Sequence, residues 1–348
     1  MRESLAHQLV FGTFISLTVA TFVGFLGEFG WFFDLASHFR LQFSSLGLLL
    51  ATLYIFRLKT KLAFYCLILM FINIFPLWST TEKGNAGHLN PTASQSVIVS
   101  FNLDRQNINY DSVITYLSGS NADIVFLTEV TAAWRPQLRK LQEAFPYHFE
   151  VPEWVPSEEQ DSKFWWRKGD PAMSVALFSK IPWTFVKDHS LGVTGRSLAI
   201  RSHFSTNGYA LSLIAVQLLM PLPSYEAGLQ ETELKGLARL VKELNGPLLV
   251  IGDFNLTPYS ARFRKLLNKA GLHRAPGGIN PTYPAKLGLF ALPLDHTLFK
   301  GGMNLNVIAG PNLGSDHRPI ITTLTYLAPT SARDNRNLFG NQQNVALP

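Results

Sequence analysis

The sequence predicts an α/β domain of two mixed β-sheets packed face to face with helices outside, preceded by an N-terminal helical membrane segment. Three observations lead to this prediction. Long apolar stretches fill most of the first 78 residues. The rest of the chain alternates short apolar runs with amphipathic segments, and polar side chains recur where those runs end. Of the 348 residues, 47% are apolar and only 16% are charged, and the shortage of charge is concentrated in the N-terminal part.

Three apolar stretches, at about 9–33, 41–56 and 62–78, open the chain. A membrane-spanning helix needs about 17–25 mainly apolar residues. The first and third stretches are long enough, whereas the second is short unless it includes 36–39. The first is too long for the core of a signal peptide and is followed by two more apolar stretches. Residues 1–78 are therefore predicted to form a membrane anchor of about three helices. Two spans or an interfacial hairpin are the alternatives.

Basic side chains predict the orientation of this anchor. They gather in the turn 57–61 and at Arg2, whereas Asp34, His38 and Arg40 give the loop between the first two stretches no net excess. Short cytoplasmic loops are enriched in Lys and Arg. The N-terminus and the turn 57–61 are therefore expected in the cytoplasm, and with three spans the following domain lies outside. If the second stretch does not span, that domain lies inside.

The remaining boundaries follow from composition. Residues 79–94 are polar, with Gly, Asn and Pro, and are predicted to form a linker. Residues 329–348 have no apolar periodicity and are predicted to be disordered, which leaves 95–328 as the soluble domain.

The net charge of the chain is +6, but its Lys and Arg residues form no continuous block, so the charge indicates anion binding only weakly. Cys66 is the only cysteine, so disulfides within the chain and Cys-based zinc sites are excluded.

The soluble domain alternates strands and helices. Strands are predicted at 96–101, 123–127, 174–179, 197–203, 209–216, 247–251, 294–299 and 319–326, and helices at 110–117, 133–145, 225–244 and 260–270. The pair 197–203 and 209–216 has the pattern of an antiparallel hairpin, so the sheet is not purely parallel. About ten strands and three or four helices favour two mixed sheets that pack face to face.

Polar side chains stand where several of these strands end. Asn102 follows the first strand, Glu129 follows the second, and Asp253 and Asn255 follow the strand 247–251. A carboxylate buried at such a place is costly unless it is paired or binds a ligand. Alone, the sequence Gly252-Asp253-Phe254-Asn255 indicates an Asx turn just as well.

The last two strands carry the other polar groups. Asp295 lies within the strand 294–299, and Asp316 and His317 precede the final strand. An isolated Asp-His pair is more often a surface turn, but Asp295 is a suitable partner for the His317 imidazole. His296 is expected on the opposite strand face in a structural role. Together with the strand-end groups, these oxygen-bearing side chains are hard ligands suited to Mg²⁺ or Mn²⁺ and to phosphoester hydrolysis.

The motifs SFN, LTEV, GDFN, LDHTLF and GSDHRP occur in this order between about residues 96 and 326. In these motifs the chain resembles the endonuclease/exonuclease/phosphatase superfamily, related to deoxyribonuclease I and exonuclease III. With its apolar segments it is similar to the bacterial membrane-anchored members. The resemblance implies a four-layered α/β sandwich, a Mg²⁺ (or Mn²⁺) cofactor, and a multi-pass protein of the bacterial inner (plasma) membrane. The orientation predicted from the basic turn then puts the catalytic domain on the periplasmic or extracellular side.

The resemblance also implies roles for single residues. Glu129 is the principal metal ligand, with Asn102 and Asp316 close to the metal or phosphate. The other roles are catalytic: Asp253 activates or orients the attacking water, Asn255 holds phosphate oxygens, and Asp295 and His317 form a dyad that contacts the phosphate. Whether Asp253 or His317 takes the proton of the water stays open.

One position departs from the family pattern. The family has a His, or in some branches a Tyr, where this chain has Gln217. A Gln amide can donate a hydrogen bond but cannot supply a proton at neutral pH. This predicts reduced activity or a leaving group that needs no acid, unless the alignment is displaced by a residue or two.

Two further features allow two interpretations each. Arg196 either contacts a substrate phosphate or is a surface arginine beside a hairpin. The loop 154–168 contains three tryptophans and both kinds of charge. It either stacks on bases or a membrane surface, or packs as a lid.

The leading hypothesis is a membrane-anchored, divalent-metal-dependent phosphodiesterase or phosphatase with its catalytic domain outside the cytoplasm. Its partners are the lipid bilayer and a phosphoester substrate, either a lipid head group, a nucleic acid or a small phosphoester, and no protein partner is predicted. A nuclease is the second hypothesis, but it would need a basic groove. A weakened, membrane-bound binding module is the third, and Gln217 is its only support.

Overall fold

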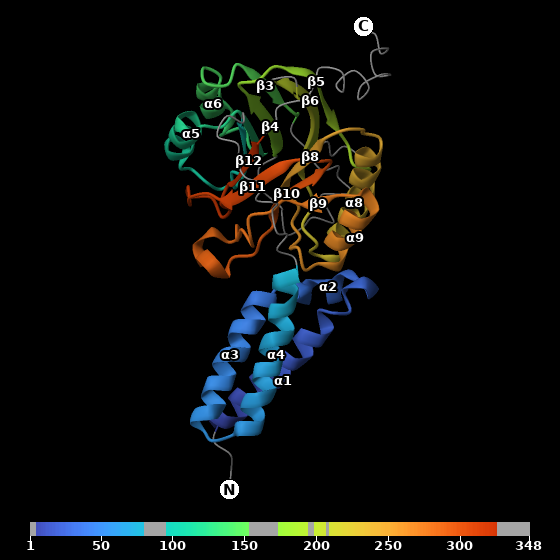
Figure 1. Ribbon diagram of the computed structural model, residues 1–348. Coiled ribbons are helices and arrows are strands. Elements are labelled where there is room, and N and C mark those ends of the chain that lie inside the picture. The colour runs from blue at the N-terminus through green and yellow to red at the C-terminus, as the bar shows by residue number, and fades with distance from the viewer. Residues whose placement is uncertain (1–4, 80–94, 153–172, 194–197, 207–208, 326–348) are drawn as a thin grey trace.

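The computed structural model describes residues 5–79, 95–152, 173–193, 198–206 and 209–325. A bundle of helices lies beneath a larger sandwich of two sheets (Figure 1). The predicted tail, the tryptophan-rich loop, Arg196 and the linker after Ser79 lie outside the described residues.

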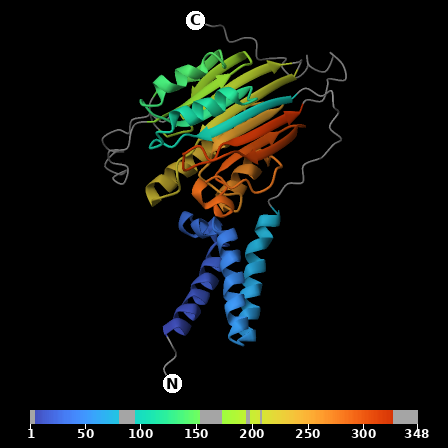
Figure 2. The ribbon, with the colours of Figure 1, turned by 90° about the vertical axis from the view of Figure 1, so that its left-hand side faces the viewer.

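The N-terminal part is helical. It contains α1 (Leu5–Val23), the 3-10 turn η1 (Gly27–Phe29), α2 (Trp31–Ser37), α3 (Arg40–Phe56) and α4 (Thr60–Ser79). Helices α1, α3 and α4 run side by side in both views (Figures 1 and 2) and share an apolar core that includes Leu17, Tyr54 and Cys66. Among the described residues, α1 and α4 are long and apolar enough to cross a membrane. There are three such spans if α2 and α3, which meet at a bend of 57°, count as one.

The expected first span, 9–33, is wrong in its C-terminal part, because α1 ends at Val23. Two glycines in the break allow close packing. A side chain at Gly24 would come within 2.8 Å of the Arg40 guanidinium, and one at Gly27 within 2.7 Å of the Asp34 carboxylate. The chain turns in this region and continues as α2, which lies across the upper end of the bundle (Figure 1).

The sandwich contains two six-stranded sheets in the described residues. The first has the order β11-β12-β1-β2-β4-β3, with β1 (Gln95–Asn102), β2 (Ile124–Val130), β3 (Tyr147–Glu150), β4 (Ser174–Ser179), β11 (Asn304–Ala309) and β12 (Ile320–Thr325). The second has the order β5-β6-β7-β8-β10-β9, with β5 (Trp183–His189), β6 (Ala199–Thr206), β7 (Tyr209–Gln217), β8 (Leu248–Asp253), β9 (His273–Arg274) and β10 (Asp295–Lys300). In each sheet one central pair is parallel, β1 with β2 and β7 with β8, and the other pairs are antiparallel. The prediction of mixed sheets is confirmed.

Three apolar cores separate four layers (Figure 2). The middle core fills the space between the sheets and includes Phe126, Leu213 and Ile251. The first sheet is covered on its outer face by α5 (Tyr110–Gly119) and α6 (Arg135–Leu138), and the second by α8 (Ser224–Lys242) and α9 (Ala261–Ala270). This is the predicted four-layered α/β sandwich.

Some predicted elements differ in detail. The expected helix 133–145 is two short pieces, α6 and the 3-10 turn η2 (Arg139–Leu141). The apolar residues that suggested it are nevertheless buried: Trp134, Leu138, Leu141 and Phe145. The predicted list also omitted strands β3, β5, β9 and β11. All four lie at sheet edges, where partial exposure or short length weakens the apolar pattern.

The sheet topology gathers the polar strand ends at one edge of the sandwich. Parallel β1 and β2 end together there, as do β7 and β8, where Gln217 pairs with Asp253. Antiparallel β10 begins at the same place, because Asp295 pairs with Asp253. Asp295 is thus the first residue of its strand and not in mid-strand as expected. We call this edge the polar edge.

Candidate active site

Asp253, at the end of β8, lies at the centre of the polar edge. Its Oδ2 accepts hydrogen bonds from Asn102 Nδ2 at 3.1 Å and from Asn255 Nδ2 at 3.3 Å. Its Oδ1 accepts the Asn255 backbone N–H at 2.9 Å, so the Asx turn and the site coincide. Gly252 permits this arrangement: it has φ +136°, and a Cβ there would lie 1.9 Å from the Val216 carbonyl oxygen.

Glu129 faces Asp253 from the first sheet. It has φ +56°, and the pairing of β2 with β4 is irregular between Leu127 and Val130. A positive φ is uncommon for a residue with a side chain and is enriched at functional sites. Glu129 Oε1 accepts hydrogen bonds from Asn102 Nδ2 at 3.2 Å and from Gln217 Nε2 at 3.3 Å. The side-chain amides of Asn102 and Gln217, both predicted site residues, therefore donate to the same carboxylate oxygen.

The other Glu129 oxygen faces Arg105. Oε2 accepts the Arg105 backbone N–H at 3.1 Å and its Nε–H at 3.3 Å. Burial raises the pKa of Glu129, but the charge of Arg105 and the hydrogen bond from Asn102 outweigh it and bring the pKa below its usual value. Glu129 is therefore an ionised carboxylate at neutral pH.

Asp295 and His317 form a buried pair. His317 Nδ1 lies 2.7 Å from Asp295 Oδ2, and His317 Nε2 lies 4.0 Å from Asp253 Oδ2. Tyr283 packs its ring against the imidazole, with 4.8 Å between ring centres. Burial lowers the pKa of His317, and the carboxylates of Asp295 and Asp253 more than offset this, which raises it to about 10. Burial raises the pKa of Asp253 to about 7, with His317 opposing and Asp295 adding to the rise.

The turn before β12 brings Asp316 and His317 to this place. Ser315 Oγ donates to the Asn102 carbonyl oxygen at 2.7 Å and accepts the His317 backbone N–H at 2.9 Å. The pKa of Asp316 is raised to about 6, first by burial and then by nearby carboxylates that include Asp104 and Glu129, against the lowering effect of His317. Asp316 therefore lies within electrostatic reach of Glu129.

The donor set fits a divalent cation that prefers oxygen. Ligand atoms of Asp253, Asp295 and His317 lie within 4.8 Å of one another. Within the described part of the chain, Asp295 Oδ1 is buried without a hydrogen-bond partner. Burial is the main cause of the raised pKa values of Asp253 and Asp316, and neighbouring carboxylates add to the rise. Carboxylate and carboxamide oxygens are ligands of Mg²⁺ and Mn²⁺, and Glu129, Asn102 and Asp316 would hold such an ion beside Asp253.

The structure thus brings almost all predicted site residues together. Gln217 lies in the site and donates a hydrogen bond to Glu129. Arg196 lies outside the described residues. Sequence reasoning missed Arg105 and Tyr283, because neither ends a strand nor belongs to a polar motif. His296 has the structural place expected of it, with Nε2 at 2.8 Å from the Leu256 carbonyl oxygen.

A family model and two curated proteins match the sequence of this chain. A model of the Endonuclease/Exonuclease/phosphatase family matches residues 99–317. UPF0294 proteins of Vibrio campbellii and Vibrio parahaemolyticus are each 26% identical to the chain, over 160 and 159 residues, 45% and 44% of this chain and 51% of each relative. The chain spans about half the length of these curated relatives.

Solved structures share the fold. TDP2 of D. rerio, complexed with a single-strand DNA product, matches 67% of this chain and all of its own with a TM-score of 0.52 and 16% identity. A family protein from Leptotrichia buccalis matches 66% and 100% of the two chains with a TM-score of 0.52 and 14% identity. A mutant of beta toxin from Staphylococcus aureus with bound magnesium ions matches 66% and 99% with a TM-score of 0.51 and 16% identity. At these identities the likeness concerns the fold.

The family match covers more than half of the chain and includes Asn102, Glu129, Asp253, Asp295 and His317. These residues meet at one edge of a sandwich that solved structures of the same family share. The chain therefore belongs to the Endonuclease/Exonuclease/phosphatase family.

Proposed function

We propose that the protein is a membrane-anchored, divalent-metal-dependent phosphoester hydrolase, either a phosphodiesterase or a phosphatase. Members of this family are metal-dependent phosphoester hydrolases. The observation that carries the proposal is the contact of two groups of side chains at the polar edge. The Asp295–His317 pair lies beside Asp253, and Asp253 shares the Asn102 amide with Glu129.

The side chains divide the work of hydrolysis. Glu129, Asn102 and Asp316 would hold Mg²⁺ or Mn²⁺, which when bound neutralises charge on a phosphate oxygen. Asp253 orients the attacking water, and its Oδ2 is the group that can take up the water's proton, because the raised pKa of His317, whose Nε2 lies 4.0 Å away, keeps the imidazole protonated at neutral pH. Asp295 holds the imidazole so that its Nε2 can donate to the phosphate as negative charge develops.

Gln217 and Asn255 complete the proposed site. The Gln217 amide holds Glu129 in place but has no proton to give, so good leaving groups react without assistance and poor ones react slowly. Asn255 has its Nδ2 directed at the Leu218 carbonyl and at Asp253. It needs to release one of these bonds when it contacts a phosphate oxygen.

We further propose that residues 1–78 anchor the protein in a bacterial inner membrane with the catalytic domain on the periplasmic or extracellular side. The apolar helices α1 and α4 support the anchor, and the basic turn 57–61 supports the orientation.

A metal-dependent nuclease is the second candidate. The fold shared with D. rerio TDP2, solved with a single-strand DNA product, favours it. The weak clustering of basic residues in the sequence counts against it. A binding module without activity is disfavoured, because the carboxylates and the Asp295–His317 pair are kept in contact.

The full-length protein in detergent, assayed on bis-p-nitrophenyl phosphate, plasmid DNA and phospholipid with Mg²⁺ or EDTA, tests these proposals. Turnover should require the metal and fall by about a hundredfold or more in Glu129→Gln and in His317→Asn. Glu243→Gln, at the exposed end of α8, is the matched control and should keep its turnover. A folded protein without turnover on any substrate would favour the binding module, and turnover on DNA alone would favour the nuclease.

A further inference from the structure

The polar edge of the sandwich rests on the N-terminal helices. Asp34 of α2 accepts the Ser260 hydroxyl at 2.6 Å and the Ala261 backbone N–H at 2.7 Å, which places its carboxylate at the N-terminus of α9. His38 Nδ1 accepts the Thr257 backbone N–H at 3.2 Å. Thr257 is only four positions after Asp253. The segment that follows the central carboxylate is therefore fixed to α2 and to the residues that join it to α3.

A second segment of the polar edge touches the same helices. The Gln42 side chain of α3 donates from Nε2 to the Phe290 carbonyl oxygen at 2.6 Å. Phe290 ends the 3-10 segment η4 (Ala285–Phe290), which begins with the hydrogen bond from the Ala285 N–H to the Asp316 carbonyl oxygen. One segment thus reaches from Asp316 in the site to the upper end of α3.

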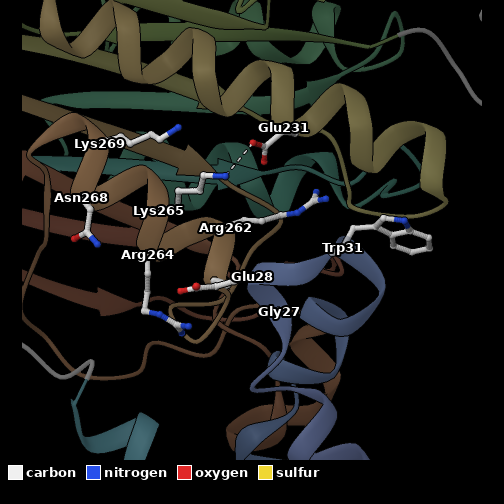
Figure 3. A pocket seen from close by; sticks show the side chains of 11 residues that line it. Gly27, Glu28, Trp31, Glu231, Arg262, Arg264, Lys265, Asn268 and Lys269 are labelled. Carbon is white, nitrogen blue, oxygen red and sulfur yellow. Dashed lines mark ion pairs between the residues drawn. The ribbon is translucent and has the colours of Figure 1, made fainter.

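The upper end of the bundle has the features of a membrane–water boundary. Helix α2 lies across the bundle there (Figure 1), and the aromatic side chains of Phe29 and Phe32 are 80% and 62% exposed. Trp31 lies beside them at the rim of a cavity (Figure 3). Aromatic residues collect at the level of lipid head groups. Since the polar edge rests on α2, it lies at that level.

Basic side chains occupy the same level. The cavity of about 600 Å³ lies between α2 and α9, and α9 contributes Arg262, Arg264, Lys265 and Lys269 to its lining (Figure 3). Glu28 of η1 and Glu231 of α8 also line the cavity, and Glu231 pairs with Lys265 at 3.6 Å. The basic side chains nevertheless outnumber the acidic ones in the lining. Cationic side chains at head-group level attract anionic lipids.

Segment η4 presents apolar side chains at this level. Leu287, Leu289 and Phe290 are 54%, 80% and 50% exposed. Two other loops of the polar edge also expose a large apolar side chain each, Ile108 after β1 and Leu222 after β7. Exposed apolar groups gathered beside a site mark a surface that is covered by a partner. The hydrogen bond between Gln42 and Phe290 holds this surface next to α3. The partner that covers it is therefore the bilayer in which α1, α3 and α4 are proposed to lie.

We propose that η4 places Leu287, Leu289 and Phe290 in the membrane interface and that the substrate is a phosphoester carried by a lipid of the same membrane. The inference rests on the proposed hydrolase function. In the reaction, water adds to phosphorus, the bond from phosphorus to one ester oxygen breaks, and that oxygen leaves as an alcohol with one proton of the water. A lipid phosphodiester thus yields a phosphomonoester and an alcohol, one of which stays in the bilayer.

The membrane contact is tested with a nitroxide at position 289. Cys66 is the only cysteine and is buried, so Leu289→Cys in a Cys66→Ala background gives one labelled position. Ile308→Cys in the same background is the control, because Ile308 is another exposed apolar residue, at 50% against 80% for Leu289, but lies on edge strand β11. In vesicles of phosphatidylethanolamine and phosphatidylglycerol, the label at 289 should collide more with oxygen and less with a nickel chelate than the label at 308. Equal accessibility to nickel at both positions would overturn the proposal.

The substrate is tested by comparing lipid and soluble diesters. The full-length protein is given the same vesicles or bis-p-nitrophenyl phosphate, and the released alcohols and phosphomonoesters are identified in both phases by mass spectrometry. The double variant Leu287→Asn with Leu289→Asn should lower the ratio of lipid to soluble turnover by about tenfold or more, and Ile308→Asn should leave the ratio unchanged. If the wild-type protein hydrolyses bis-p-nitrophenyl phosphate but not the lipids, this inference is overturned and the proposed function stands. If the wild-type protein hydrolyses neither substrate, the proposed hydrolase function itself is refuted.

Discussion

His317 Nδ1 lies 2.7 Å from Asp295 Oδ2, and Asp295 pairs across the strands with Asp253. The imidazole is therefore held at the end of a fixed strand pair, with its second nitrogen directed to Asp253. An orientation fixed in this way fits a group that donates to a phosphate as negative charge builds up on it.

Asp295→Asn should lower kcat on bis-p-nitrophenyl phosphate by about 10²–10⁴-fold, because the imidazole loses the carboxylate that orients and charges it. Metal affinity, measured as the Mg²⁺ concentration for half-maximal rate, should change much less. Asp111→Asn, in a side chain that is 92% exposed, is the control and should behave as the wild type. A variant with normal kcat would show that the pair has only a structural role.

Gln217→His should favour poor leaving groups. The amide donates to Glu129 from the end of β7, so an imidazole there lies in the site and can supply a proton. We expect the rate on an alkyl phosphodiester, relative to a p-nitrophenyl diester, to rise by about tenfold or more. The comparison of the two substrates is the measurement, with Gln217→Asn as the control. An unchanged ratio would mean that position 217 does not face the leaving group.

His203, which is not one of the site residues, should make the free energy of unfolding depend on pH. Its Nε2 accepts hydrogen bonds from Arg201, and its Nδ1 lies 2.9 Å from Ser212 Oγ. Burial and, second, the charge of Arg201 lower the pKa of His203 to about 4. The folded-state value lies below that of the unfolded chain, so the unfolded chain binds the extra proton between about pH 6.5 and 4. The contribution of His203 to stability is complete above pH 6.5 and is lost as the pH falls through this window.

His203→Gln removes this titration, and thermal unfolding midpoints of the variant and the wild type measure it. Between pH 7 and pH 4 the midpoint of the variant should fall less than that of the wild type. The reason is that the unfolded variant has no imidazole at position 203 that could take up a proton. Parallel pH profiles of the two proteins would contradict the assignment.

Asp34→Ala should loosen the contact between the bundle and the sandwich. The change removes the acceptor of the Ser260 hydroxyl and of the Ala261 N–H at the start of α9. Loss of such a cap costs about 0.5–2 kcal/mol. Hydrogen exchange in the first turn of α9 should become faster, and exchange in α5 should not. Asp111→Ala is the matched control, and equal protection of α9 in the two variants would show that the docking does not depend on Asp34.

The fold class and the gathering of the site were predictable because both follow from local patterns. Apolar runs define the central strands, and Asn102, Glu129 and Asp253 stand at their ends. The topology then needs only parallel central pairs to bring these groups to one edge. The turn containing Asp316 and His317 was also recognisable, since its motif precedes a strand.

The remaining features depend on contacts that no local pattern records. Asp34 lies 226 residues from Ser260 in the sequence, so its role in docking could not be foreseen. The close approach of Arg40 to Gly24 and of Asp34 to Gly27 after the end of α1 is likewise a contact between separate segments. Arg105 pairs with Glu129 from an ordinary polar loop, which carries no signal of that role.

The contact between Gln42 and Phe290 fixes the height of the site relative to the bundle. If the bundle lies in a bilayer, the site moves with it and meets molecules that diffuse in the same plane. Its rate on such molecules then follows their fraction of the membrane surface. Dilution of the whole sample with buffer leaves that fraction, and hence the turnover per protein, unchanged.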